Sequence, residues 1–179
     1  MSLFVLYANR LFYKTISPVR TGGWARTASA LLVVCLAASI LAGCGLGVRT
    51  RALAGGKVRV QVFVAQNANQ NNPVAVDLVM VYDKNLLKEL TRMSAKDWFE
   101  RRDQIKRDYT EGQGLDAWEW EWVPGQSVPA QALPLKPAAI GALVFANYFT
   151  PGVHRGRFDP HESIAVNLLE TSFTVEPVK

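Results

Sequence analysis

The feature that most restricts the fold of this chain is a strict alternation of residues that begins at position 57. Valines occupy every second position from Val58 to Val64, and the residue before each of them is, in order, Lys57, Arg59, Gln61 and Phe63. Side chains of a β-strand point alternately to the two faces of its sheet, so a two-residue period predicts a strand. Because only one of its faces is uniformly apolar, the strand is expected to be half-buried.

A second apolar run begins at Pro73, after the polar segment 65–72 (AQNANQNN). Alternate residues of this run share one face, and they are Val74, Val76, Leu78, Met80 and Tyr82. The polar segment has almost no apolar content and is predicted to be a loop. Two strands joined by a polar turn are predicted to pair as antiparallel neighbours.

Further strands are predicted in the second half of the chain. Residues 118–122 (WEWEW) place three tryptophans on one face and two acids on the other, and residues 139–149 are apolar on both faces, as in a central strand. Pro129 and Pro134 restrict residues 127–135 to an edge strand or an extended loop. Residues 163–175 resemble a strand that is broken near Glu170.

Between these strands the period changes to that of a helix. Residues 84–91 are predicted to form a short helical turn. Ser94 is followed three residues later by Asp97, a variant of the pattern that caps a helix N-terminus. Apolar residues then recur at helical spacing until Tyr109, with opposite charges four residues apart.

These elements amount to six or seven strands and one clear helix. They predict a mainly β fold: a two-sheet antiparallel sandwich at residues 57–179, with a helical insertion at about 84–110.

The first 43 residues have the pattern of an export signal. Arg20 and Arg26 precede an uncharged apolar run of about 15 residues, which is short for a membrane-spanning helix of ~20 residues. The run ends at Leu41-Ala42-Gly43-Cys44, which resembles the lipobox of bacterial lipoproteins at all four positions. Residues 1–43 are therefore predicted to be a signal peptide removed before Cys44, whose thiol would take a diacylglycerol; the alternative is an uncleaved anchor helix.

Two details concern the leader and the start of the mature chain. Residues 1–19 precede the usual basic region, so either the true start lies after Met1 or the leader is long. Residues 44–56 are small and are predicted to be a lipidated flexible tether. By resemblance to lipoprotein sorting in Gram-negative bacteria, Gly45 in place of an Asp favours transfer to the outer membrane.

Charge and cysteine content exclude several classes of protein. Four of the 20 Lys and Arg residues lie in the leader, which has no acid, so the remainder nearly balances the 15 Asp and Glu. A nearly neutral domain is not expected to bind nucleic acid. No cysteine follows Cys44, which excludes an internal disulfide and paired-cysteine zinc in the mature domain. No catalytic motif is present, so we expect neither enzyme activity nor any cofactor beyond the diacylglycerol and N-acyl chain on Cys44.

The segment from the first strand to the second, VRVQVFVAQNANQNNPVAVDLVMVYD, resembles the type VI secretion lipoprotein family TssJ (SciN or VasD). Members have an Asn-rich loop, a proline, a Val-rich strand that ends near a tyrosine, and then a short helical insertion, as at residues 86–109 here. The Val123-Pro124-Gly125-Gln126 turn before an apolar segment is also similar. The resemblance spans roughly residues 44–177.

The resemblance implies a transthyretin-like sandwich anchored by lipid on the periplasmic face of the outer membrane. It also implies a multi-subunit complex in which the chain binds the periplasmic domain of TssM, an inner-membrane protein. The loop between the first two strands would contribute to that contact, through Gln66, Asn67, Asn69, Gln70, Asn71 and Asn72.

Other interpretations of the sequence stay open. The chain could serve another envelope machine as a pilotin-like lipoprotein. Trp118, Trp120 and Trp122 could stack on a sugar, although three large rings on one face more often fill a core. His154 and His161, with Asp159 and Glu162, could bind a metal, but a polar turn explains them as well.

Overall fold

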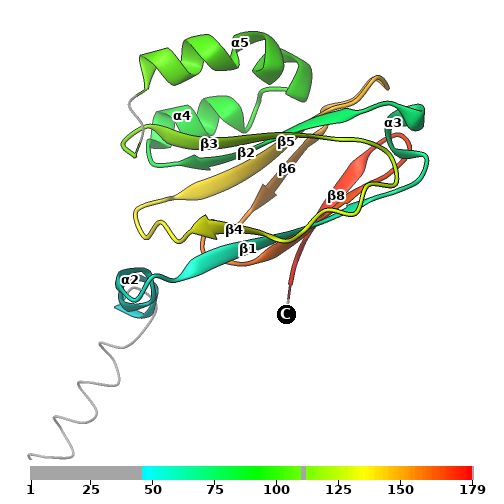
Figure 1. Cartoon of the computed structure of the whole chain (residues 1–179). Coiled ribbons are helices and arrows are strands. Elements are labelled where there is room, and N and C mark those ends of the chain that lie inside the picture. The colour runs from blue at the N-terminus through cyan, green and yellow to red at the C-terminus, as the bar shows by residue number, and fades with distance from the viewer. Residues whose placement is uncertain (1–45, 110–111, 179) are drawn as a thin grey trace, which may run out of the picture. The chain divides into compact units, whose positions relative to one another are not determined.

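The computed structural model describes residues 46–109 and 112–178 as two four-stranded sheets packed face to face, with helices outside them (Figure 1). The predicted leader and Cys44 lie outside the described residues. The sheet that contains the first strand has the order β4 (Gln131–Pro134), β1 (Lys57–Val64), β7 (Ile164–Leu168) and β8 (Phe173–Pro177). The other sheet has the order β3 (Leu115–Trp122), β2 (Val74–Val81), β5 (Gly141–Asn147) and β6 (Arg155–Phe158).

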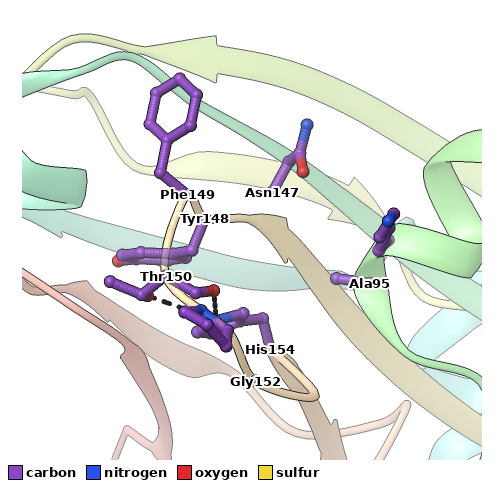
Figure 2. A pocket seen from close by; sticks show the side chains of 9 residues that line it. Ala95, Asn147, Tyr148, Phe149, Thr150, Gly152 and His154 are labelled. Carbon is purple, nitrogen blue, oxygen red and sulfur yellow. Dashed lines mark hydrogen bonds between the residues drawn. The ribbon is translucent and has the colours of Figure 1, made fainter.

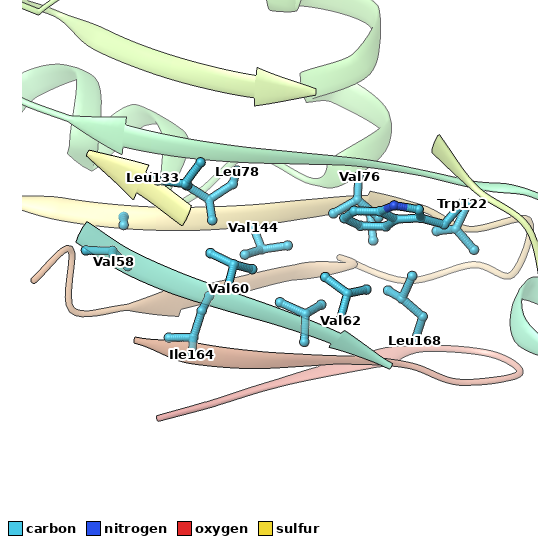
Figure 3. Packing of buried hydrophobic residues seen from close by; sticks show 14 of the residues in the cluster. Val58, Val60, Val62, Val76, Leu78, Trp122, Leu133, Val144, Ile164 and Leu168 are labelled. Atoms are coloured by element: carbon cyan, nitrogen blue, oxygen red, sulfur yellow. The ribbon is translucent and has the colours of Figure 1, made fainter. Parts of the chain in front are cut away.

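The predicted fold class is confirmed, with one difference in strand direction. Within the sheets, five of the six pairings are antiparallel, and β1 pairs with β7 in parallel. The break expected near Glu170 is the turn between β7 and β8. The core between the sheets is built from alternate residues of β1, β2, β5 and β7, among them Val60, Val76, Val144 and Ile164 (Figure 3).

The prediction that the first two strands pair with each other is wrong. β1 pairs with β4 and β7, whereas β2 pairs with β3 and β5 in the opposite sheet. The reason lies in the burial of β2, which is apolar on both faces, with Leu78 facing one hydrophobic cluster and Val79 the other. Such a strand needs a covering layer on each side, and the helices cover only the second sheet. The polar segment after β1 therefore crosses from one sheet to the other.

The helical insertion is confirmed as α4 (Lys84–Leu90) and α5 (Ala95–Asp108), which pack on the outer face of the β2 sheet. Ser94 forms a capping box with Asp97 at the start of α5. The indole ring of Trp98, on α5, stacks on Phe145 of β5 with ring centroids 4.9 Å apart. Trp98 is fully buried, so this stack fixes the helix on the sheet.

A buried acid on β2 also holds α5 in place. Asp77 is inaccessible to solvent and accepts hydrogen bonds from Trp98 Nε1 at 2.8 Å and from Arg102 Nη1 at 2.8 and 3.0 Å. Burial raises the pKa of the Asp77 carboxyl above its ordinary value, because the bonds from Arg102 and Trp98 offset only part of the desolvation. Two side chains of the helix thus converge on one carboxylate of the sheet.

The tryptophans of β3 lie at the edge of the sandwich. Trp122 is 5 % exposed and belongs to the core between the sheets (Figure 3). Trp118 and Trp120 are half-buried and pack against this core. Trp120 stacks on Trp122 with centroids 5.4 Å apart. The three rings therefore pack on the sandwich core, while Trp98 belongs to the separate cluster under the helices.

The prediction of a flexible tether is wrong for residues 46–53, which form the helix α2 (Leu46–Leu53). Val48 and Ala52, one helical turn apart, pack against the sandwich core and hold the segment in place. The segment between Gly47 and Ala54 has no glycine, and most of its residues favour helices. Within the part of the chain that the structure describes, no helix has the length and apolar character needed to span a membrane.

We expect Asp77→Ala to lower the free energy of unfolding by about 2 to 3 kcal/mol. The change leaves the Trp98 N–H and a partly buried guanidinium without their acceptor, and breaking a buried charge pair costs about 3 to 5 kcal/mol where no other partner is near. Arg102 also lies 3.5 Å from Glu119, which reduces the loss. Urea unfolding followed by tryptophan fluorescence measures the change.

The matched control is Asp103→Ala, which removes a 76 % exposed acid from the same helix and should cost less than about 0.5 kcal/mol. Equal losses in the two variants would contradict a special role for Asp77.

Candidate functional site

The polar segment after β1 forms a tight turn, α3 (Ala68–Asn71), at one end of the sandwich (Figure 1). Three successive residues have left-handed backbone conformations, with φ of 47° at Asn69, 54° at Gln70 and 63° at Asn71. Asn tolerates this region better than most residues, whereas Gln pays a steric cost there. An Asn-rich sequence is therefore what such a turn requires.

Asn69 is the hydrogen-bonding centre of this turn. Its side chain is 1 % exposed, its Nδ2 donates to the Pro73 carbonyl at 2.8 Å, and its Oδ1 accepts from the Phe149 amide at 2.8 Å. Its backbone amide donates to the Leu169 carbonyl at 3.1 Å. Asn69 thus joins the turn to the segment after β5 and to the segment after β7.

The neighbouring polar residues tie the same loops together. The Gln70 amide donates to the Glu170 carbonyl at 3.1 Å, and Asn67 Nδ2 donates to the Glu170 carboxylate at 3.0 Å. Asn72 Nδ2 donates to the carbonyls of Asn69 and Gln70 at 3.2 and 3.0 Å. The loop is consequently an ordered structure with most of its backbone fixed.

The six residues predicted to bind a partner have different environments. Gln66, Asn67, Gln70 and Asn71 are exposed, Asn72 is half-buried, and Asn69 is buried with its side-chain bonds made inside the protein. Asn69 can therefore shape the surface but cannot offer its amide to another molecule. The role of the exposed residues stays a prediction.

Exposed apolar side chains lie beside this turn. Phe149, whose amide Asn69 holds, is 71 % exposed, and Leu169, whose carbonyl accepts from Asn69, is 43 % exposed. Val123 is 51 % exposed on the turn after β3, where the Gly125 amide donates to the Ala65 carbonyl at 3.0 Å. We call this set the loop-end surface, and it comprises Gln66, Asn67, Gln70, Asn71, Val123, Phe149 and Leu169.

Sequence patterns do not single out these three apolar residues. Phe149 directly follows the buried Tyr148, and Leu169 directly follows the buried Leu168. The signal that could have found Phe149 is the Pro151-Gly152 pair just after it, since a turn there predicts that the end of the apolar run lies at the surface.

The loop-end surface and α2 lie at opposite ends of the sandwich (Figure 1). α2 precedes β1 in the chain and the turn follows it, so the eight residues of β1 separate the two ends. At about 3.3 Å per residue, this separation is on the order of 25 Å.

A pocket of about 440 Å³ lies next to Phe149, between the segment after β5 and the start of α5 (Figure 2). His154 stacks on the Tyr148 ring with centroids 4.9 Å apart, and its Nε2 lies 2.7 Å from the Thr150 carbonyl. Burial raises the pKa of the Tyr148 hydroxyl to about 12, and this hydroxyl donates to the Leu169 carbonyl. The lining residues include Lys96 but no carboxylate.

The histidines do not form a metal site with each other in the described part of the chain. His154 precedes β6 and His161 follows it, so the strand separates them. His161 instead pairs with Asp159, with Nδ1 and Oδ1 3.3 Å apart. Across the described residues, no group of three His, Cys, Asp or Glu side chains is placed to hold a metal ion.

Comparison with known proteins finds likeness in structure but not in sequence. No protein-family model matches the chain, and no curated protein matches it. The solved structures that it resembles share between 15 and 17 % of their residues with it.

Three of these structures carry the comparison. The type VI secretion lipoprotein TssJ1 from Pseudomonas aeruginosa matches with a TM-score of 0.53 and 15 % identity, over 69 % of this chain and 96 % of that one. A chain of a type VI membrane complex matches with a TM-score of 0.53 and 16 % identity, over 68 % of this chain and 98 % of that one. A chain in the structure described as the TssM C-terminal domain (869-1107) from EAEC matches with a TM-score of 0.51 and 17 % identity, over 68 % and 98 %. The expected resemblance to TssJ is thus confirmed as a resemblance of fold.

We expect Asn69→Ala to destabilise the protein by about 2 to 3 kcal/mol, because it leaves the Phe149 amide without its acceptor and places a residue less suited to φ of 47° in the turn. Gln70→Gly should leave stability equal or raise it by up to about 1 kcal/mol, because glycine adopts a left-handed conformation without strain. Thermal unfolding of the two variants gives both values. Similar destabilisation by both would show that the turn does not depend on the Asn69 side chain.

Proposed function

We propose that this chain is a TssJ-like lipoprotein of a type VI secretion membrane complex. It is exported, cut before Cys44, and anchored by acyl chains on the periplasmic face of the outer membrane. There it binds the periplasmic domain of a TssM-like inner-membrane protein through its loop-end surface. The fold shared with the secretion lipoprotein TssJ1 is the observation that carries the proposal.

The lipid anchor is supported by the sequence around Cys44. A charged segment, an apolar run and Leu-Ala-Gly-Cys occur in the order that export and lipidation require. One acyl chain gives only marginal membrane binding, at about 0.8 kcal/mol per buried methylene, so a diacylglycerol with an N-acyl chain would hold the protein firmly. The acyl groups are the only non-protein groups that we propose.

The positions of the two ends support a mechanical role. Lipid on Cys44 would hold the α2 end at a membrane, and the loop-end surface lies at the other end of a two-layer sandwich. Because packed β-sheets resist deformation, the sandwich can carry force between a membrane and a partner. An anchor for a secretion machine needs that property rather than a catalytic site.

The chemistry of the loop-end surface fits a protein partner. Phe149, Leu169 and Val123 offer apolar area, and exposed amides of Asn67, Gln70 and others lie next to them. Binding energy at protein interfaces concentrates in a few large apolar or aromatic side chains, and polar groups around them give specificity. The hydrogen bonds of Asn69 fix these loops before binding, which lowers the entropy cost of association.

A carbohydrate-binding lipoprotein is the second candidate, and the half-buried rings of Trp118 and Trp120 favour it. Sugar binding would compete with packing inside the protein, because one face of the Trp120 ring already stacks on the buried Trp122. A pilotin-like lipoprotein of another envelope machine would share the anchor but not the partner. A glycan-dependent shift of tryptophan fluorescence would favour the carbohydrate-binding lipoprotein. Capture of a partner other than a TssM-like protein would favour the pilotin-like lipoprotein.

We expect Phe149→Ser to weaken binding of the purified TssM-like periplasmic domain by at least about tenfold, since a central aromatic residue of an interface contributes about 2 kcal/mol or more. The side chain is 71 % exposed, so its loss should leave the fold intact. Biolayer interferometry measures the affinity. Ile140→Ser, at a 40 % exposed position on the turn before β5, is the control and should bind normally. If Phe149→Ser bound as tightly as the parent, the loop-end surface would not be the interface.

We expect Cys44→Ser to abolish incorporation of an alkyne-labelled fatty acid in cells and to leave the leader uncut, because no other cysteine follows position 44. Cys35→Ser, within the leader, is the control and should be labelled as the parent is. Label that persists in Cys44→Ser would place the lipid elsewhere.

A further inference from the structure

The end of the sandwich that carries α2 is positively charged. Arg49, Arg51, Lys57 and Arg59 are all exposed. No Asp or Glu occurs in the sequence from Cys44 until Asp77. None of the four cations takes part in an ion pair with another described residue. We call these four residues the basic end.

Hydrogen bonds bring the two parts of the basic end together. The Gly56 amide donates to the Arg51 carbonyl at 2.8 Å, which folds α2 back against the start of β1. The segment after β6 joins both parts, since Arg51 Nη2 donates to the His161 carbonyl at 3.5 Å and the Arg59 amide donates to Ser163 Oγ at 3.1 Å. That segment adds two acids, Asp159 and Glu162, so positive charge remains in excess there.

The orientation of α2 exposes an apolar side chain among these charges. Val48 and Ala52 face the sandwich core, so the opposite side of the helix faces solvent. Leu53 lies on that side and is 88 % exposed, the most exposed large apolar residue in the described part of the chain. A single exposed apolar side chain can enter the boundary of headgroups and acyl chains, while neighbouring Arg side chains stay at the level of the headgroups.

We propose that the basic end binds the anionic phospholipid headgroups of the membrane that holds the acyl chains. α2 lies along the surface with Leu53 at the boundary of headgroups and acyl chains, and the four cations contact phosphates. Each Lys or Arg near an anionic leaflet strengthens binding by about fivefold, and the attraction falls off within a Debye length. The choice of membrane rests on the proposed lipid at Cys44, two residues before α2.

This contact would set the orientation of the whole domain. A lipid chain alone leaves the sandwich free to rotate about its attachment, whereas a second contact at α2 and β1 removes most of that freedom. Because the loop-end surface lies at the opposite end of β1, it would then point away from the membrane and towards the periplasm. The basic end thereby presents the partner-binding loops at a fixed height.

Vesicle co-sedimentation of residues 45–179, produced without leader or lipid, tests the proposal. This piece contains both hydrophobic clusters complete. It should bind vesicles of phosphatidylcholine with phosphatidylglycerol but not of phosphatidylcholine alone, and the binding should weaken as NaCl is raised. The quadruple variant Arg49→Gln, Arg51→Gln, Lys57→Gln, Arg59→Gln should bind at least about tenfold more weakly, and Leu53→Ser a few-fold more weakly.

The matched control removes the same charge from exposed positions on and between α4 and α5: Lys84→Gln, Lys88→Gln, Arg92→Gln and Lys96→Gln. It should bind within about twofold of the parent. Equal losses in the two quadruple variants, salt-independent binding, or no binding to the anionic vesicles would each overturn the proposal. The assay contains neither partner nor acyl chain. A negative vesicle result would therefore not contradict the proposed interface or the proposed lipidation, and disproof of either would not change the vesicle result.

Discussion

The arrangement of the loop end depends on one buried amide. Asn69 accepts a hydrogen bond from the Phe149 amide, donates to the Pro73 carbonyl, and fixes the Leu169 carbonyl through its own backbone. The loops it joins follow β1, β5 and β7, which belong to two different sheets. A left-handed turn of three residues is costly, and it persists because these bonds determine its shape. The exposed side chains next to Asn69 therefore have defined positions before any partner arrives.

A second buried polar group performs the same kind of task on the outer face of the β2 sheet. Asp77 accepts hydrogen bonds from Trp98 and Arg102 and thereby fixes α5. The first residues of α5 line the pocket beside Phe149. The two sites place polar contacts at the boundaries between elements, while valines and leucines fill the interior. The result is a rigid body with a basic end at α2 and a loop-end surface opposite to it. This polarity agrees with the proposed connection between a membrane and a partner.

Sequence patterns predicted the parts of this structure that follow from local periodicity. The predicted strands, the helical insertion and the Ser94 capping box depend on residues close in the chain, and they are confirmed. β6 was missed, because its four residues, Arg155–Phe158, lie in a segment whose composition is that of a loop. The predicted pairing of β1 with β2 was wrong. An alternating strand such as β1 can belong to either sheet, and the helices that cover β2 determine which sheet contains β2. α2 was missed because its helix depends on the contacts of Val48 and Ala52 with a core formed by distant residues. The Asn-rich segment was predicted as a loop from its own composition. The burial of Asn69 and the exposure of Phe149 depend on contacts with distant residues, so only the fold reveals them.

Photo-crosslinking in cells tests whether the loop-end surface contacts a periplasmic partner, as we propose. A photo-reactive phenylalanine analogue fits at Phe149, because that aromatic ring is exposed. Irradiation of cells that express the secretion genes should then yield an adduct with the TssM-like inner-membrane protein. The same analogue at Lys88, exposed on α4, should yield none. An adduct from position 88 and none from position 149 would show that the partner binds elsewhere on the domain.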